Sequence, residues 1–135
     1  ATVPQITIQC GASFGAGNYG MCGRGYAPRF LFSWPGAKTA VMGGEQAART
    51  MQQVTEAAMA RKGMPVDAEQ MQKQYDQIVA MFEAQADAFV TSGLLLDDGV
   101  IDPRDTRDVL SFCLDTLAEA DSRALRPMQF GVARM

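Results

Sequence analysis

The feature that most constrains this chain is a glycine-rich run that directly follows an apolar strand. Nine of the 13 glycines lie between Gly11 and Gly44, and the densest part comes straight after a strand predicted over Val3–Cys10. Glycine lets the backbone adopt positive φ and lets a ligand approach the main chain closely. Unpaired N–H groups in such a loop bind oxyanions. The sequence therefore predicts a backbone site for a negatively charged oxygen.

Composition indicates an ordinary globular chain. Its 135 residues are 47% hydrophobic and 20% charged, as in typical soluble domains. Its apolar stretches are too short for a membrane-spanning helix, and its N-terminus lacks the features of a signal peptide. A net charge of −3 with scattered Lys and Arg argues against nucleic acid as a partner. The chain enters a strand directly after Ala1, which suggests a piece of a longer protein.

The cysteines and the absence of histidine limit the possible chemistry. Cys10, Cys22 and Cys113 are odd in number and lack metal-ligand spacing, which favours reduced and mostly buried thiols. The sequence has no histidine, which excludes Ser-His-Asp and Cys-His arrangements and histidine-based metal sites within the chain. We expect no metal. Backbone amides, together with a base brought by the substrate, fit the glycine loop best.

Strands alternate with helices along the chain, which predicts an α/β fold. Further strands are predicted over Phe30–Trp34, Lys38–Met42 and Leu94–Leu96. A helix over Glu45–Ala60 is expected to end at Gly63, and its predicted apolar face holds Ala47, Met51, Val54 and Ala58. A third helix should begin at Asp102 and Pro103. Its predicted buried face comprises Val109, Leu110, Cys113, Leu114 and Leu117.

The longest predicted helix runs from Asp67 to Thr91 and begins with a capping-box-like pair, Asp67 and Gln70. Its apolar stripe consists of Met71, Tyr75, Ile78, Phe82 and Phe89. This stripe is long for so small a domain, and the other predicted helices are shorter. We therefore expect part of the stripe to contact another domain or subunit.

Gly15–Gly20 matches the pattern G-x-G-x-x-G of dinucleotide-binding loops. That fingerprint also needs a helix that begins inside the motif and an acidic residue about 20 residues further on. Gly23, Gly25 and Pro28 would end such a helix within about two turns, and no acidic residue precedes Glu45. The context therefore argues against a dinucleotide site.

Several blocks of the sequence together resemble the carboxyltransferase (beta) subunit of biotin-dependent acyl-CoA carboxylases. The blocks are Gly11–Arg24, Pro28–Phe30, Trp34–Pro35, Ala40–Ala47, Leu96–Pro103 and Phe130–Met135. They are most similar to the branch that acts on 3-methylcrotonyl-CoA and geranyl-CoA. Two positions depart from that pattern, Leu94 in place of arginine and Gly36 in place of asparagine, which leaves the exact thioester open.

The resemblance implies a crotonase-like (ClpP/crotonase) α/β fold, a superhelix of β-β-α units. Residues 1–135 would be the C-terminal part of the carboxyltransferase C-domain, without the N-terminal carboxyltransferase domain. The family places two oxyanion-hole amides at positions that match Ala16 and Gly17. They would stabilise the ureido oxyanion left when carboxybiotin gives up its carboxyl group, and the residues alone do not separate a biotin role from a thioester role. The loop could instead be a tight turn that packs a helix on a strand.

Neighbouring residues complete the predicted site. Biotin or substrate contacts are expected from Phe14, Gly15, Asn18, Tyr19, Gly43 and Gly44. The last two glycines precede a helix and could form an anion site, although a plain helix start accounts for them better. Asp97, Asp98 and Asp102 are better explained by a turn and a helix cap than by a metal site.

The resemblance also implies partners and a cellular location. It implies an acyl-CoA substrate, biotin on the carrier domain of the biotin carboxylase (alpha) subunit, and a homo-oligomer of beta subunits. The expected compartment is the bacterial cytoplasm, or the mitochondrial matrix in a eukaryote. Two other functions stay open: a non-catalytic module for oligomerisation and biotin docking, and a fragment of a crotonase-like hydratase or isomerase.

Overall fold

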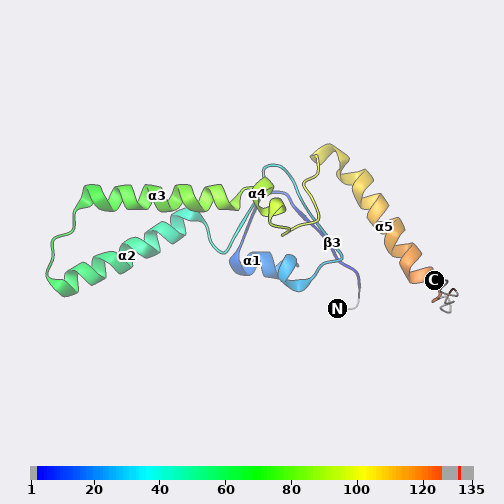
Figure 1. Ribbon diagram of the computed structural model, residues 1–135, viewed down its shortest axis with the longest axis horizontal. Coiled ribbons are helices and arrows are strands. Elements are labelled where there is room, and N and C mark those ends of the chain that lie inside the picture. Colours follow the sequence, from blue (N-terminus) through cyan, green and yellow to red (C-terminus); the bar gives the residue numbers. More distant parts are fainter. Residues whose placement is uncertain (1–2, 126–130, 132–135) are drawn as a thin grey trace.

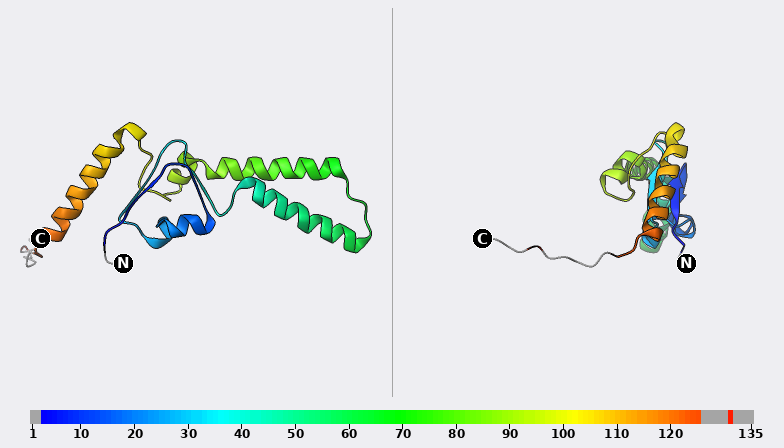
Figure 2. Two further views of the ribbon diagram at one scale, coloured as in Figure 1. Left: turned by 180° about the vertical axis from the view of Figure 1, so that it is seen from behind. Right: turned by 90° about the vertical axis from the view of Figure 1, so that its right-hand side faces the viewer.

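The structure is a computed structural model that describes residues 3–125 and residue 131. Two small sheets lie at the centre of an elongated chain (Figure 1). A pair of long helices projects from one side of these sheets, and the C-terminal helix projects from the other (Figure 2). Of the blocks that carry the family resemblance, Phe130–Met135 lies outside the described residues except for Gly131.

Both sheets are two-stranded and parallel. The strands are β1 (Ile6–Gln9), β2 (Ala12–Phe14), β3 (Phe30–Ser33) and β4 (Lys38–Ala40). β1 pairs with β3, with Ile6 opposite Phe30, and β2 pairs with β4, with Ala12 opposite Lys38. The three strands predicted between Val3 and Met42 are confirmed with shorter bounds, whereas β2 falls inside the predicted glycine loop.

Gln9 joins the two sheets. Its side chain is buried, and its Oε1 accepts hydrogen bonds from Ser33 Oγ at 3.3 Å and from Thr39 Oγ1 at 2.6 Å. Ser33 belongs to β3 and Thr39 to β4. A buried polar side chain needs such partners, and here those partners come from both sheets.

The segment Asp98–Ile101 follows the outer side of β3. Asp98 N donates to Leu31 O at 2.7 Å, and Ile101 N donates to Ser33 O at 2.9 Å. The strand predicted over Leu94–Leu96 is therefore wrong. These leucines form an exposed turn in which Leu95 has a positive φ of 60°, and the paired residues come a few positions later.

Two 19-residue helices, α2 (Gly44–Lys62) and α3 (Ala68–Ala86), form an antiparallel hairpin. The predicted termini are confirmed: Gly63 ends α2 in the left-handed conformation, and Asp67 accepts hydrogen bonds from the first turn of α3. The single helix predicted up to Thr91 is wrong. It breaks at Asp87, which is extended and caps a separate short helix, α4 (Ala88–Gly93).

The apolar stripe of α3 packs against α2 within this chain, and its expected contact with another domain or subunit stays a prediction. Met71 is buried, and Tyr75, Ile78 and Phe82 are half-buried along the α2 seam, whereas Phe89 lies on α4 and is 62% exposed. α2 is as long as α3, so the expectation of shorter neighbouring helices is wrong. The predicted apolar face of α2 is also displaced. Ala47 is buried, but Met51, Val54 and Ala58 are exposed. Of these three only Met51 borders the seam, where Ala48, Gln52 and Thr55 also lie.

The C-terminal helix begins as predicted. Asp102 caps a short 3-10 turn, η2 (Pro103–Asp105), which leads into α5 (Thr106–Ser122). Trp34 Nε1 donates to Thr106 Oγ1 at 3.0 Å and fixes the start of α5. On the predicted face Cys113 is buried, but Leu114 is 58% exposed. Among the described residues, no helix has the length and apolar character needed to cross a bilayer.

Candidate functional site

The glycine-rich segment forms a short helix, α1 (Gly15–Gly20), directly after β2. The predicted open loop is therefore a helix of about 1.7 turns, and it ends at Gly20, within the two turns that the flanking glycines allow. Gly15 has a positive φ of 50°, and a Cβ there would lie 2.8 Å from Val41 O. Glycine is needed at this junction because the chain turns sharply from strand to helix beside β4.

The backbone N–H groups of Ala16 and Gly17 point out of the first turn of α1. N–H groups in a first helical turn have no partner within the helix, and no acceptor for these two is found within residues 3–125 and 131. Both residues are exposed. The space where a Gly17 side chain would stand is empty within 4 Å. Two adjacent donors are therefore open to a ligand.

Asn18 is engaged inside the protein. Its Nδ2 donates to Ser13 Oγ at 2.9 Å, and Gly23 N donates to its backbone oxygen at 2.8 Å. A Cβ on Gly23 would lie 1.9 Å from Asn18 Oδ1, so the amide side chain rests directly on the Gly23 backbone. The structure thus gives this predicted contact residue a role in joining α1 to β2 and to the following segment.

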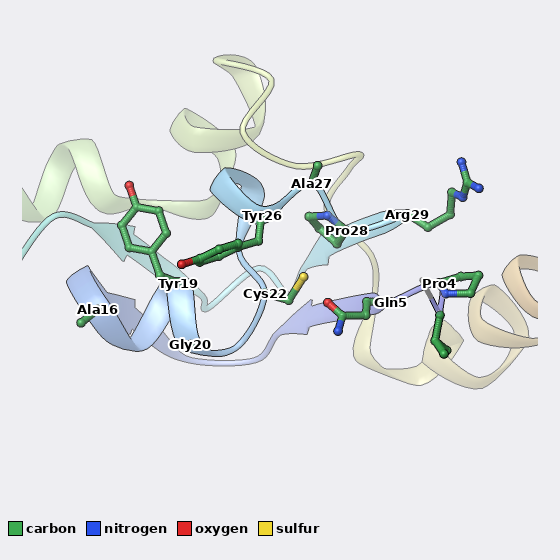
Figure 3. A pocket seen from close by; sticks show the side chains of 11 residues that line it. Pro4, Gln5, Ala16, Tyr19, Gly20, Cys22, Tyr26, Ala27, Pro28 and Arg29 are labelled. Carbon is green, nitrogen blue, oxygen red and sulfur yellow. The ribbon is translucent and has the colours of Figure 1, made fainter. Parts of the chain in front are cut away.

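Tyr19 stands at the edge of a cavity of about 1110 Å³. Its ring contacts Tyr26 edge-on, with centroids 5.7 Å apart, and a Cβ on Gly25 would lie 2.5 Å from it. Figure 3 shows Ala16, Tyr19 and Tyr26 on one side of the cavity and Arg29 at the far end. The lining residues are Val3, Pro4, Gln5, Ala16, Tyr19, Gly20, Cys22, Tyr26, Ala27, Pro28 and Arg29.

Sequence reasoning assigned no role to Tyr26, Cys22 or Arg29. All three lie within residues 22–29, and the cavity that they line is formed only when the fold brings this segment beside residues 3–5 and 16–20. Arg29 was singled out only as part of the Pro28–Phe30 block. Its exposed guanidinium is the one cation on the wall of this cavity as the described residues form it.

Gly43 and Gly44 do not line the cavity beside Ala16. They start α2 and border a separate cavity of about 350 Å³, together with Phe14. A Cβ on Gly44 would lie 3.1 Å from Val79 O on α3. Close packing of the two helices therefore accounts for Gly44, which agrees with a plain helix start. Of the predicted contact residues, Ala16 and Tyr19 line the larger cavity, and Phe14 lines the smaller one.

The three aspartates singled out in the sequence have structural partners. Asp97 is buried and its Oδ1 accepts from Gly99 N at 3.1 Å, while Asp102 Oδ1 accepts from Arg104 N at 2.9 Å. Hydrogen bonds from Arg104 hold the pKa of Asp102 below its ordinary value. The turn and the helix cap are confirmed. No cluster of three or more metal-ligating side chains occurs in the part of the chain that the structure describes.

The cysteines differ from one another. All three are free, but only Cys113 is buried, and Cys10 is exposed. The expectation of mostly buried thiols is therefore wrong for Cys10. Burial, and secondarily the charge of Asp98, raise the pKa of the Cys113 thiol above its ordinary value, which makes this side chain an unreactive part of the core.

Comparison with known proteins places this geometry in a family. Residues 1–131 match the carboxyl transferase domain. The whole chain is 48% identical to a quarter (25%) of a probable biotin-dependent acyl-coenzyme A carboxylase beta2 subunit from Mycobacterium tuberculosis. It is 47% identical to 23% of a probable mitochondrial methylcrotonoyl-CoA carboxylase beta chain from Drosophila melanogaster.

A solved structure gives the same result. The beta subunit of Pseudomonas aeruginosa geranyl-CoA carboxylase matches all of this chain with a TM-score of 0.87 and 43% identity, over 25% of that subunit. The chain therefore spans about a quarter of the length of the relatives it matches. Its mixed arrangement of parallel strands and helices is the crotonase-like fold of those domains. The chain belongs to the carboxyl transferase domain family.

Proposed function

We propose that this chain is the C-terminal part of a carboxyltransferase C-domain and supplies half of an active site in a biotin-dependent acyl-CoA carboxylase. The match of the entire chain to a geranyl-CoA carboxylase beta subunit, at 43% identity and a TM-score of 0.87, carries this proposal. The other half of the site would come from the N-terminal carboxyltransferase domain. The reaction moves a carboxyl group from biotin on a partner subunit to an acyl-CoA.

The amides of Ala16 and Gly17 are the proposed oxyanion hole. A ureido oxygen that gains negative charge needs two adjacent donors on an open surface, and both residues are exposed with N–H groups that point out of the first turn of α1. The cavity of about 1110 Å³ also has room for a bicyclic ring beside Ala16. Biotin, when bound, supplies the carboxyl group and a nitrogen that accepts the substrate proton. The two amides hold the oxygen in place, and one such donor is worth about 10²–10³ in rate.

The proposed substrate is a branched α,β-unsaturated acyl-CoA, either 3-methylcrotonyl-CoA or geranyl-CoA. The relatives whose names include these thioesters support this assignment. The edge-on pair of Tyr19 and Tyr26 gives the cavity beside Ala16 two aromatic ring faces in a lining that is otherwise partly polar. Such ring faces suit a hydrocarbon or the rim of a ring rather than a charged group.

The proposed partners are an alpha subunit that carries biotin and further copies of the beta subunit. The accessible surface of the chain is 10320 Å², whereas a compact monomer of this mass exposes about 6,900 Å². Both sheets have only two strands. Surface of this extent is expected where the rest of the subunit and other copies pack. The proposed location is the cytoplasm of a bacterium or the matrix of a mitochondrion, since the relatives include a bacterial protein and a mitochondrial one.

Reconstitution tests the proposal. The isolated chain and the full-length subunit are each incubated with biotin carboxylase, biotin carrier, ATP, bicarbonate and 3-methylcrotonyl-CoA or geranyl-CoA. We expect turnover from the full-length subunit only, and recovery when the chain is coexpressed with the remainder of the beta subunit. Turnover by the isolated chain at the rate of the full-length subunit would overturn the split site. A full-length subunit that assembles with its partners but carboxylates neither thioester would overturn the proposed activity.

A further inference from the structure

α1 cannot hold its own position. Three of its six residues are glycines and none of the six is buried, and glycine is the poorest helix former after proline. Phe14 stands at its N-cap and makes no side-chain cap. The place of the Ala16 and Gly17 amides must therefore be set by contacts that the neighbouring residues make with the rest of the fold.

Asp98 makes the longest-range of these contacts. Its Oδ2 accepts from Leu31 N at 2.8 Å, and its own N–H donates to Leu31 O at 2.7 Å, so the residue is fixed to β3 from two sides. Its remaining oxygen, Oδ1, accepts from Arg24 Nη2 at 3.0 Å. Asp98 thus joins β3 to a segment 74 residues earlier in the chain.

Arg24 begins the 3-10 turn η1 (Arg24–Tyr26), which follows α1 after the connecting residues 21–23. The preceding residue, Gly23, donates its N–H to Asn18 O at 2.8 Å and touches the Asn18 side chain. Thr7 Oγ1 on β1 donates to Cys22 O at 2.9 Å and holds the same segment from another side. A rigid path therefore leads from Asp98 through Arg24 and Gly23 to α1.

We propose that Asp98 is a positioning residue for the Ala16 and Gly17 amides and acts on them through Arg24. This inference rests on the proposed function. The side chains of Arg24 and Asp98 are 39% and 35% exposed, and ion pairs of this exposure contribute little to global stability. The effect of the pair is therefore expected in the placement of α1, where small displacements of catalytic donors have large effects on rate.

Asp98→Asn in the full-length subunit, assembled with its partners, tests the inference. The new side chain can still accept from Leu31 N, but its amide nitrogen would face the Arg24 guanidinium. We expect backbone amides of 15–26 to exchange with deuterium about tenfold faster. The kcat of carboxylation should fall roughly 10- to 100-fold, with KM for both substrates changed less than about twofold because the substrates keep their contacts. Arg24→Lys should retain more activity than Arg24→Met.

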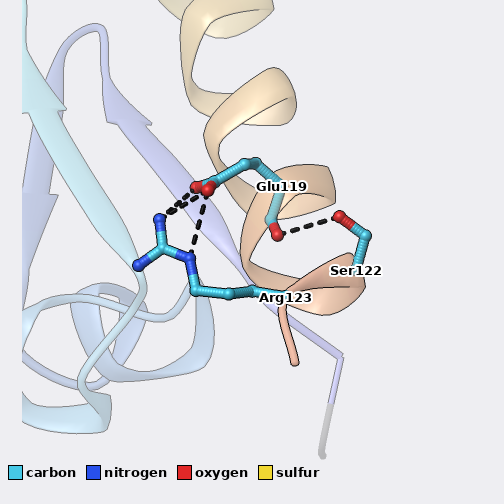
Figure 4. Close-up of polar contacts among 3 residues, drawn as sticks. All are labelled: Glu119, Ser122 and Arg123. Atoms are coloured by element: carbon cyan, nitrogen blue, oxygen red, sulfur yellow. Dashed lines mark hydrogen bonds and ion pairs between the residues drawn. The ribbon is translucent and has the colours of Figure 1, made fainter. Parts of the chain in front are cut away.

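The matched control is Glu119→Gln. Glu119 pairs with Arg123 at the end of α5 through bonds of 2.7 and 3.1 Å, far along the chain from α1 (Figure 4). This variant removes an exposed ion pair of similar kind, and we expect wild-type exchange and kcat.

Two results separate this inference from the proposed function. Unchanged exchange and unchanged kcat in Asp98→Asn would overturn the positioning role and leave the proposed function standing. Faster exchange of 15–26 with normal kcat would show that Asp98 does hold α1, and it would overturn the assignment of these amides to the reaction. Asp98→Asn could instead lower the melting temperature and prevent assembly, with losses of similar size in Glu119→Gln. The Arg24–Asp98 pair would then have only a general structural role, and the inference would be overturned.

Discussion

The segment around α1 and the α2–α3 hairpin are held in place by different means. α1 and η1 depend on residues far away in sequence, such as Thr7 and Asp98. In the hairpin, α2 and α3 contact one another along their length, and their ends carry their own signals: Gly63 at the end of α2 and Asp67 at the start of α3. The segment around α1 contains the proposed oxyanion donors, the amides of Ala16 and Gly17. The hairpin contains most of the helical residues.

This difference has a physical reason. A helix with an apolar stripe and good caps obtains its stability from its neighbour in sequence. Backbone N–H groups that must stay unpaired for a ligand cannot be secured by helix bonds, so they need support from elsewhere in the fold. We therefore expect substitutions in the α2–α3 hairpin to lower the stability of the hairpin alone, and substitutions near α1 to lower the kcat of carboxylation.

The largest expected effect comes from Ile78→Asp with Phe82→Asp in the full-length subunit. Both side chains are half-buried on the α2 seam, and two carboxylates there should cost roughly 3–6 kcal/mol in hairpin stability. Hydrogen exchange should show α2 and α3 unprotected while 15–26 keeps its protection. Loss of protection in both regions at once would show that the hairpin and the α1 segment unfold as one cooperative unit.

Val54→Asp with Ala58→Asp is the matched control on α2. Both side chains are exposed, Val54 to 59%, and neither lines the cavity between α2 and α3. The hairpin should therefore keep its exchange protection. Sedimentation velocity of this variant also tests assembly: smaller oligomers would place a subunit contact on the outer face of α2, in place of the α3 stripe.

The second largest effect is expected from Gly17→Pro. Proline removes the Gly17 N–H, and loss of one oxyanion donor costs at least about 10²-fold in kcat. Ala16→Ser keeps its N–H and should be much milder. Light scattering must show normal assembly, since proline also restricts the residue before it. A correctly assembled Gly17→Pro enzyme with near-normal kcat would remove α1 from the mechanism.

Sequence reasoning succeeded where the signals are local. The ends of α2 and the starts of α3 and η2 were predictable from Gly63, Asp67 and Asp102, because caps act within one turn. It failed at Asp87, where the apolar spacing continues across the break and a bridge to Lys38 ends the helix. The displaced face of α2 has a similar cause, since the fold decides which part of a wide apolar arc meets α3.

The candidate site shows the same division. The glycine pattern and the family resemblance pointed to Ala16 and Gly17, which the structure shows exposed on α1. The internal role of Asn18 was not predictable, because it depends on Ser13 and Gly23 approaching from two directions. The same holds for Arg24 and Asp98, which lie in two separate family-like blocks with no local signal that they form a pair.

A smaller effect is expected from Asp67→Ala. Asp67 Oδ1 accepts from Glu69 N at 3.0 Å and from Gln70 N at 3.3 Å. Loss of such a cap costs about 1 kcal/mol, so the first turn of α3 should exchange roughly fivefold faster. Asp76→Ala, in the middle of the same helix, is the control and should change exchange little. If Asp76→Ala increased exchange in the first turn of α3 as much as Asp67→Ala does, the Asp67 cap would not be what stabilises that turn.

The smallest effect concerns pH. Burial raises the pKa of the Cys113 thiol above its ordinary value of 9.0, so the folded chain holds this proton more tightly than the unfolded chain. The stability that results is complete below pH 9.0 and is lost as pH rises through the higher folded value. Melting temperatures at pH 8, 9 and 10 should fall less steeply for Cys113→Ala than for wild type. Cys10→Ala, at an exposed thiol, should keep the wild-type slope.

The parallel pairing of the strands determines where this chain tolerates a change of length. Gln9 pairs with Ser33, and Ala12 pairs with Lys38. The chain advances three residues from Gln9 to Ala12 but five from Ser33 to Lys38, and the two extra residues lie in the Pro35–Gly36 turn. One residue inserted there would shift β4 by one position and turn Thr39 away from Gln9. The exposed connection between α2 and α3 pairs with no strand, so insertions and engineered tags belong there.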